Sequence, residues 1–437
     1  MVTVAPERAN PAGLPERIPG AKGESMRRLM TWAVLAALIV ALAGLAAGCG
    51  GDDDEAAATQ ATGAGETTTA STEPIKIGWA YDRAGQMAPF DGPALAAAQI
   101  RVDQLNEEGG VAGRQLEIET CNTQNNDPAK AKACATSLLD GGADIIFVTC
   151  DVDFATPVVQ EAIGEGKLAI APCIGTDQMG PKRFGERGKL AFSFGNVAQD
   201  EGSAMAEFAN SQGWKTAAIA TNTLLVYFKN VTAAFEKRFT ELGGRVVARE
   251  SYATGANNVG AAVSRLNGAD ADVVVTSTAF GELPALVSGL RSLGNTTPIL
   301  NSWAGDGTYW ATKNPQVTNY YAVTYASVFG DDPNADVKEM ITALTDAGAA
   351  PGTGGFLAGA GAIDGVAEAI ERADGSTEGE RLAAEIEKFD GVETISGEVS
   401  FSPELHTVFG REYRVIRVEK NKGQYVEGVT AKVVPKI

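Results

Sequence analysis

Short apolar runs rich in β-branched residues alternate with amphipathic helical stretches in the region that follows residue 74. Three runs predict strands, at residues 75–78, 116–119 and 144–148. The helical patterns between them, at 93–108 and 127–140, begin at prolines suited to a first turn and end at glycine pairs. Strands that alternate with helices in this way indicate a parallel sheet with helices on both faces. Small ligands bind at the carboxyl ends of the strands in such sheets.

The same alternation restarts after Phe194 and predicts a second series of strands and helices up to residue 301. Helical segments follow at 335–346, 356–373 and 378–389, and a C-terminal hairpin follows at 412–429. A chain of 437 residues is longer than one core normally organises. We therefore predict an α/β protein with two lobes of the same type.

The N-terminal region has the pattern of an export signal. Met26-Arg27-Arg28 precedes an apolar run at 32–47, which is too short for a confident membrane span and matches a secretory signal. The run ends in Leu45-Ala46-Ala47-Gly48-Cys49, similar to a bacterial lipobox with Ala46 in place of the usual aliphatic residue. We predict that residues 1–48 are an N-terminal extension plus signal peptide, and that Cys49 accepts diacylglycerol. Two acyl chains suffice for stable anchoring to the cell membrane.

Alternatives to the lipoprotein signal are an ordinary signal peptide or a retained anchor helix. Translation can start at Met1 or at Met26. After Cys49, residues 49–74 contain an acidic cluster and then mostly Ala, Thr, Gly and Ser, which predicts a disordered tether. The net charge of -19 argues against nucleic acid as a partner, because no basic patch exists to neutralise phosphates.

Four cysteines remain after Cys49, an even number that favours disulfides in an exported chain. Cys121 closes a strand and Cys134 lies on the helix that follows it, while Cys150 and Cys173 each close strands expected to be neighbours. We predict the pairs Cys121–Cys134 and Cys150–Cys173. A Cys121–Cys150 bridge, or free buried thiols, are the alternatives.

Enzyme chemistry finds little support in the sequence. His406 is the only histidine, and it lies in a predicted Pro-Glu-Leu-His-Thr turn, far in sequence from any acid–nucleophile pair. The sequence therefore supports neither a Ser-His-Asp triad nor a histidine metal cluster. No phosphate-binding loop occurs, and paired cysteines leave no thiol for catalysis. We therefore expect no enzyme activity, no metal and no cofactor.

Several segments resemble the branched-chain amino acid (Leu/Ile/Val) branch of the type I periplasmic-binding-protein family, the substrate-binding proteins of ABC transporters. They are Ile75-Lys-Ile-Gly78, Asn106-Glu-Glu-Gly-Gly-Val-Ala-Gly-Arg114, Asp127-Pro-Ala-Lys-Ala131, Ala171-Pro172, Gly243-Gly244-Arg-Val-Val and Ser396-Gly397-Glu-Val-Ser-Phe401. The resemblance spans residues 75–437. It implies two Rossmann-like lobes joined by three crossovers that close on a ligand by hinge motion.

On this resemblance we place the crossovers near Phe194, near 322–329 and near 396–402. The expected division of the chain is a first lobe at 75–194, a second lobe at 195–325, a return to the first lobe at 326–398, and a hairpin on the second lobe at 399–437.

The resemblance also implies that loops of both lobes hold the ligand. The residues carried over by position are Phe90, Cys150, Asp151, Cys173, Thr176, Tyr227, Phe280 and Asp306. Asp306 can meet an ammonium group and Thr176 can contribute to an acceptor site, while the aromatic rings cover the rest. Each has a structural alternative, such as core packing for Phe280, helix packing for Tyr227 and a turn for Asp306.

Asp151 departs from the family pattern, in which a small hydroxyl residue usually follows the third strand. A carboxylate there repels the carboxylate of a zwitterionic amino acid, so a cationic or amide ligand fits better. The alternative is that Asp151 caps the next helix.

The resemblance implies an extracytoplasmic, lipid-anchored monomer that captures a small polar ligand of amino acid, amide or amine type. Its other partners are the permease subunits of an ABC importer. The alternative is a ligand sensor that acts with a separate signalling protein.

Overall fold

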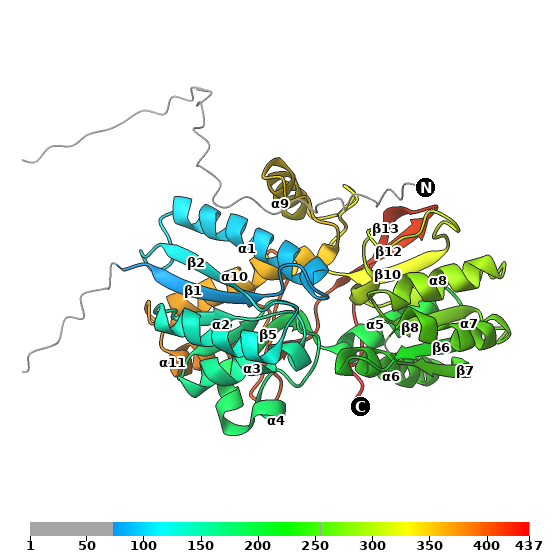
Figure 1. Ribbon diagram of the computed structural model, residues 1–437, viewed down its shortest axis with the longest axis horizontal. Helices are drawn as coiled ribbons and strands as arrows, with labels where there is room; N and C mark the ends of the chain where they lie inside the picture. Colours follow the sequence, from blue (N-terminus) through cyan, green and yellow to red (C-terminus); the bar gives the residue numbers. More distant parts are fainter. Residues whose placement is uncertain (1–72, 254, 437) are drawn as a thin grey trace, which may run out of the picture. The chain divides into compact units, whose positions relative to one another are not determined.

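The computed structural model describes residues 73–253 and 255–436, which form two sheets covered by helices (Figure 1). The predicted signal peptide, Cys49 and nearly all of the tether lie outside these residues. Within them, no helix combines the length and the apolar character needed to cross a membrane.

The first sheet has the strand order β11-β5-β4-β3-β1-β2, and all of its strand pairs are parallel. Its strands are β1 (Ile75–Tyr81), β2 (Leu116–Asn122), β3 (Ile145–Phe147), β4 (Leu168–Ala171), β5 (Ala191–Asn196) and β11 (Thr407–Val408). Its helical elements are α1 (Ala88–Glu107), α2 (Pro128–Asp140), α3 (Val152–Gly164), α4 (Pro181–Phe184) and the 3₁₀ segment η1 (Gly185–Leu190).

A later part of the chain returns to this first lobe. It comprises α9 (Ala335–Asp346), η4 (Gly354–Phe356), α10 (Leu357–Arg372) and α11 (Gly379–Ile386). Helix α10 packs on α1 and β5, α11 packs on β4, and both α9 and η4 pack on α1. The close approach of α10 to α1 requires glycine, because a Cβ atom at Gly359 would lie 1.9 Å from the carbonyl oxygen of Ala94.

The second sheet has the order β13-β12-β10-β9-β8-β6-β7. Its strands are β6 (Thr216–Asn222), β7 (Arg245–Tyr252), β8 (Val273–Ser277), β9 (Ile299–Asn301), β10 (Tyr320–Thr324), β12 (Tyr413–Glu419) and β13 (Lys422–Val429). Its helical elements are α5 (Ala198–Ser211), α6 (Val226–Glu241), η2 (Ala256–Asn258), α7 (Gly260–Asn267), α8 (Glu282–Ser292) and η3 (Trp303–Gly305). The C-terminal hairpin adds β12 and β13 in antiparallel fashion beside β10.

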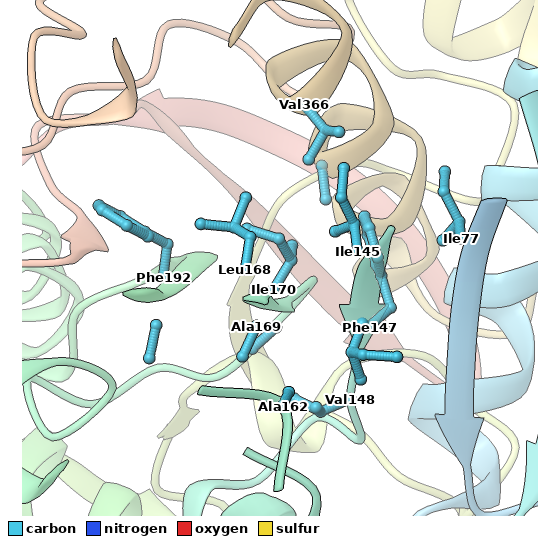
Figure 2. Close-up of a cluster of buried hydrophobic side chains, with 14 of the residues drawn as sticks. Ile77, Ile145, Phe147, Val148, Ala162, Leu168, Ala169, Ile170, Phe192 and Val366 are labelled. Atoms are coloured by element: carbon cyan, nitrogen blue, oxygen red, sulfur yellow. The ribbon is translucent and has the colours of Figure 1, made fainter. Parts of the chain in front are cut away.

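The central strands of the first sheet are buried on both faces. Ile145, Phe147, Leu168 and Ile170 are all fully buried, and Val366 of α10 packs over them (Figure 2). This explains why these strands are continuous apolar runs rather than alternating ones. Full burial of each such large apolar side chain stabilises the fold by roughly 1.5–3 kcal/mol. The rigid sheet fixes the loops at its carboxyl edge.

The chain passes between the lobes three times in the described residues: from β5 to α5, from β10 to α9, and from β11 to β12. The first two crossovers lie close to the predicted ones. The third was predicted at 396–402 but follows β11, because β11 pairs with β5 and Phe401 packs on the rings of Phe192 and Phe194. Residues 399–408 thus belong to the first lobe, and the predicted boundary at 398 is wrong by about ten residues. A strand of two residues is too short to show a hydrophobic period.

Candidate functional site

Loops from both sheets meet in one pocket. In the first lobe it is lined by residues from the loop and helix after β1 and from the loops after β3 and β4: Met87, Phe90, Cys150, Asp151, Ile174, Gly175 and Thr176. In the second lobe it is lined by residues that follow β6, β8 and β9: Leu225, Tyr227, Phe228, Ala279, Phe280, Trp303 and Ala304. All of these loops leave the carboxyl ends of parallel strands, where ligands bind in such sheets. The open volume is about 20 Å³, which admits about one water molecule.

Most of the predicted site residues lie in this pocket. The ones that line it are Phe90, Cys150, Asp151, Thr176, Tyr227 and Phe280. Two predicted residues do not line it: Cys173 is buried and bonded to Cys150, and Asp306 is buried at another position. Sequence reasoning missed Trp303 and Met87.

Aromatic rings form most of the pocket wall. Phe90 of the first lobe lies 5.1 Å from the ring of Trp303 and 6.1 Å from that of Phe280, with the planes nearly perpendicular in both pairs. Tyr227 lies 6.1 Å from Trp303 on the second lobe. Phe280 adopts a backbone φ of 53°, an uncommon conformation for a bulky residue. The two ring contacts of Phe90 join the first lobe to the second at the pocket.

Asp151 is the only charged side chain that lines the pocket. One of its oxygens, Oδ1, caps α3 by accepting hydrogen bonds from the N–H groups of Asp153 (2.9 Å) and Phe154 (3.2 Å). Burial, and secondarily the nearby carboxylate of Asp153, raises the pKa of Asp151 to about 7. Asp151 therefore caps α3 and lines the pocket at the same time, so the two predicted alternatives for this residue do not exclude each other.

Comparison with known proteins identifies the family. Residues 74–424 match the model of a family described as periplasmic binding protein. This chain belongs to the periplasmic binding protein family. The family consists of solute-binding proteins that work outside the cytoplasm, and not of enzymes.

Curated relatives and solved structures agree with this result. The chain is 22% identical over 73% of its length to the Leu/Ile/Val-binding protein homolog 3 of Brucella melitensis, covering 86% of that protein. It is also 22% identical over 76% of its length to a Pseudomonas aeruginosa protein named for binding leucine, isoleucine, valine, threonine and alanine, again covering 86% of that protein.

Two solved structures illustrate the likeness in fold. The branched-chain amino acid transporter substrate-binding protein of Streptococcus pneumoniae in complex with isoleucine has a TM-score of 0.70 at 20% identity, covering 83% of this chain and all of that one. A solute-binding protein of an ABC transporter from Rhodopseudomonas palustris in complex with 3,4-dihydroxybenzoic acid has a TM-score of 0.70 at 18% identity, covering 84% of this chain and 99% of that one. The predicted two-lobed periplasmic-binding-protein fold is confirmed.

A buried carboxyl group supports the pocket of this periplasmic binding protein from the first lobe. Asp91, in the first turns of α1, accepts hydrogen bonds from the N–H groups of Asp82 (2.9 Å) and Cys150 (2.9 Å) and from the hydroxyl of Thr149 (2.6 Å). It thereby ties the loops after β1 and β3 together. Burial raises the pKa of Asp91 to about 7. In the sequence, the feature that points to a structural role for Asp91 is its position just before the predicted start of the first helix.

A second buried carboxyl group positions the aromatic wall of the binding protein. Glu201 of α5 accepts hydrogen bonds from the Tyr227 hydroxyl at 2.6 Å and from the backbone N–H of Trp303 at 2.7 Å. Burial raises the pKa of Glu201 to about 8. Since its partners are 26 and 102 residues away, no sequence pattern reveals this role.

Both predicted disulfides are present. Cys121–Cys134 joins β2 to α2, and Cys150–Cys173 joins the loops after β3 and β4 at the pocket. The alternatives, a Cys121–Cys150 bridge or free thiols, are therefore wrong. The second bridge braces the first-lobe wall of the pocket.

Asp306 occupies a different position from the predicted one. Its carboxylate accepts hydrogen bonds from the Thr324 hydroxyl (2.6 Å), from the N–H of Gly307 (2.5 Å) and from the N–H of Gly354. Burial raises the pKa of Asp306 to about 6. It connects the loop after β9 with the beginning of η4 rather than contacting the pocket.

His406 packs inside the first lobe. His406 is buried, stacks on Phe192 with ring centroids 4.0 Å apart, and contacts the carbonyl oxygen of Ala191 through Nδ1. Burial lowers the pKa of His406. Among residues 73–253 and 255–436, no group of His, Cys, Asp and Glu side chains is arranged to hold a metal ion.

Proposed function

We propose that this chain is an extracytoplasmic solute-binding lipoprotein that captures a small polar ligand, of amino acid, amide or amine type, and delivers it to the permease of an ABC importer. One observation carries the proposal: the pocket is built from the carboxyl-edge loops of both lobes. A ligand there contacts both lobes at once and therefore favours the closed arrangement over an open one. The names of the curated relatives, which are amino acid-binding proteins, support transport rather than sensing.

We propose Phe90, Cys150, Asp151, Thr176, Tyr227 and Phe280 as ligand contacts. Cys173 contributes through its disulfide bond to Cys150. Asp306 joins the two lobes through the hydrogen bond that it accepts from the N–H of Gly354, and it is not a ligand contact. The lining contains no Lys, Arg or His, so a ligand anion meets no opposite charge there. A ligand with donor groups or a positive charge instead complements Asp151.

A thermal-shift screen of amino acids, amides, polyamines and short acids tests the proposal. A true ligand at 100 times its dissociation constant should stabilise the protein by about 2.7 kcal/mol. Calorimetry on the hit should then show weaker binding to Asp151→Ala than to the wild type. Unchanged affinity in that variant would remove Asp151 from the site, and turnover of any hit would refute the transport proposal.

The membrane part of the proposal rests on the sequence around Cys49. Cells grown with labelled palmitate should label the wild-type protein, which should fractionate with membranes, whereas Cys49→Ala should be unlabelled and soluble. Intact-mass analysis should place the mature N-terminus at Cys49. An unmodified, uncleaved N-terminus would refute the lipoprotein assignment without touching the binding function.

We further propose that the protein works as a monomer with one ligand site. Light scattering after size exclusion should give the mass of one chain, and ligand titration should give one site per chain. Purified protein should stimulate uptake of the ligand by vesicles that contain the cognate ABC permease.

A further inference from the structure

The pocket combines aromatic rings with a single negative charge. The rings that line it are Phe90, Tyr227, Phe228, Phe280 and Trp303, and the single charged group is Asp151. Ring faces carry partial negative charge, so a desolvated cation is attracted by the rings as well as by the carboxylate. An anion is repelled by both.

Rings of the two lobes meet at the pocket in perpendicular pairs. The plane of Phe90 makes angles of 85° with Trp303 and 89° with Phe280. In the present arrangement these rings contact one another. When the lobes part, rings from both sides can surround a roughly spherical group in an aromatic box, as in aromatic cages that bind quaternary ammonium groups.

The position of Phe90 explains how such a group can enter. Phe90 belongs to α1 of the first lobe, whereas Phe280 and Trp303 belong to the second. The wall therefore separates when the lobes open, and closes around the ligand when they approach. The free volume of about 20 Å³ in the present arrangement shows that the rings must part to admit any ligand larger than water.

One unpaired donor indicates what else the ligand carries. The indole Nε1 of Trp303 is buried and has no hydrogen-bond partner among the described residues. A buried N–H without a partner costs free energy, which a ligand acceptor can recover. A hydroxyl or carbonyl oxygen on the ligand would serve.

We propose that the pocket binds a small organic cation, an alkylated ammonium group that carries a hydroxyl or carbonyl oxygen a few bonds away. This inference rests on the proposed solute-binding function and specifies its ligand class. The ammonium lies within the aromatic box beside Asp151, and the oxygen accepts a hydrogen bond from Trp303.

Pairs of probes with the same shape but different charge test the proposal. Choline and acetylcholine are compared with 3,3-dimethylbutan-1-ol and its acetate, in which carbon replaces the nitrogen. Calorimetry at pH 8 should show the cations binding at least tenfold more tightly than their neutral counterparts, since a desolvated cation–π contact and an ion pair both act on the charge alone. Leucine and 4-hydroxybenzoate should bind more weakly than choline.

Two neighbouring carboxylates provide matched variants. Asp151→Asn removes the charge but retains a good helix cap, so the protein should fold and lose most of its preference for the cation. Asp153→Asn, two residues further on, removes a charge that is partly exposed, paired with Arg183 and absent from the pocket lining. That control should keep the preference of the wild type.

The outcomes separate the two proposals. Tighter binding of leucine or 4-hydroxybenzoate than of choline, or equal binding of choline and its neutral counterpart, overturns the organic-cation proposal and leaves solute binding intact. Binding of no compound in the probe set or in the wider screen counts against both.

Discussion

At the scale of single residues, buried carboxyl groups dominate the electrostatics of this protein. Burial is the largest cause of the raised pKa in every case, and the groups are Asp91, Asp151, Asp200, Glu201 and Asp306. A group whose pKa is raised on folding binds its proton more tightly in the folded state. Its stabilising contribution is therefore present at low pH and is lost as pH rises through the folded-state pKa.

Glu201 allows this to be tested at one position. Its pKa is about 8 against an ordinary value of 4.5, so the unfolding free energy should fall as pH rises from about 4.5 to 8. Glu201→Gln removes the titration, while its amide can still accept from Trp303 and donate to the Tyr227 oxygen. Denaturant melts across this pH range should therefore show a shallower decline for the variant than for the wild type.

The matched control is Glu404→Gln, because Glu404 is exposed. It should reproduce the wild-type pH profile. Parallel profiles for Glu201→Gln and wild type would contradict the assignment of a proton to Glu201 in the folded protein.

At the scale of elements, the two disulfides join secondary-structure elements at different distances from the pocket. They span sequence separations of 13 and 23 residues, for which the chain-entropy model gives similar stabilisation of about 3 kcal/mol each. Both double-serine variants should therefore lose comparable stability in denaturant melts. Ligand affinity should differ between them.

Only the Cys150–Cys173 bridge lies at the pocket, so Cys150→Ser/Cys173→Ser should weaken ligand binding severalfold by loosening the first-lobe wall. Cys121→Ser/Cys134→Ser should bind like the wild type. Equal affinities in the two variants, measured by calorimetry below their melting temperatures, would show that the bridge has no part in shaping the site.

The elements also show what the sequence could and could not predict. The alternation of apolar runs and helical periods predicted most strands of both sheets, because parallel strands buried on both faces are distinctly apolar. It did not predict β10 or β11. The resemblance, carried over by position, named six of the residues that line the pocket. Trp303 was missed although the strand before it was predicted, because contacts with Phe90 and Glu201, far away in the chain, set its place in the pocket.

Asp306 was misplaced for a different reason. Its partners lie 18 and 48 residues away, and only the folded chain brings them to its carboxylate. Residues 399–408 were assigned to the wrong lobe because a two-residue strand and one buried phenylalanine decide their position. Long-range pairing of this kind leaves no local pattern in a single sequence.

At the scale of the whole molecule, Asp306 bears on the balance between open and closed arrangements. It accepts hydrogen bonds from Thr324 of β10 in the second lobe and from the N–H of Gly354 in η4, which packs on α1 of the first lobe. The bond to Gly354 is thus one between lobes. Hydrogen bonds to charged groups contribute roughly 1.5–3 kcal/mol.

We expect Asp306→Ala to shift the molecule toward the open arrangement, because alanine has no acceptor for the N–H of Gly354. If that bond is made only when the lobes are closed, its loss changes the ratio of closed to open molecules by about tenfold or more. Small-angle scattering of the ligand-free variant should give a larger radius of gyration than the wild type. Apparent affinity should fall by the same factor as the closed fraction.

Thr324→Val removes a bond within the second lobe and should lower the melting temperature without altering radius or affinity. An Asp306→Ala protein with wild-type radius and affinity would show that the bond to Gly354 does not set the balance between the closed and open arrangements.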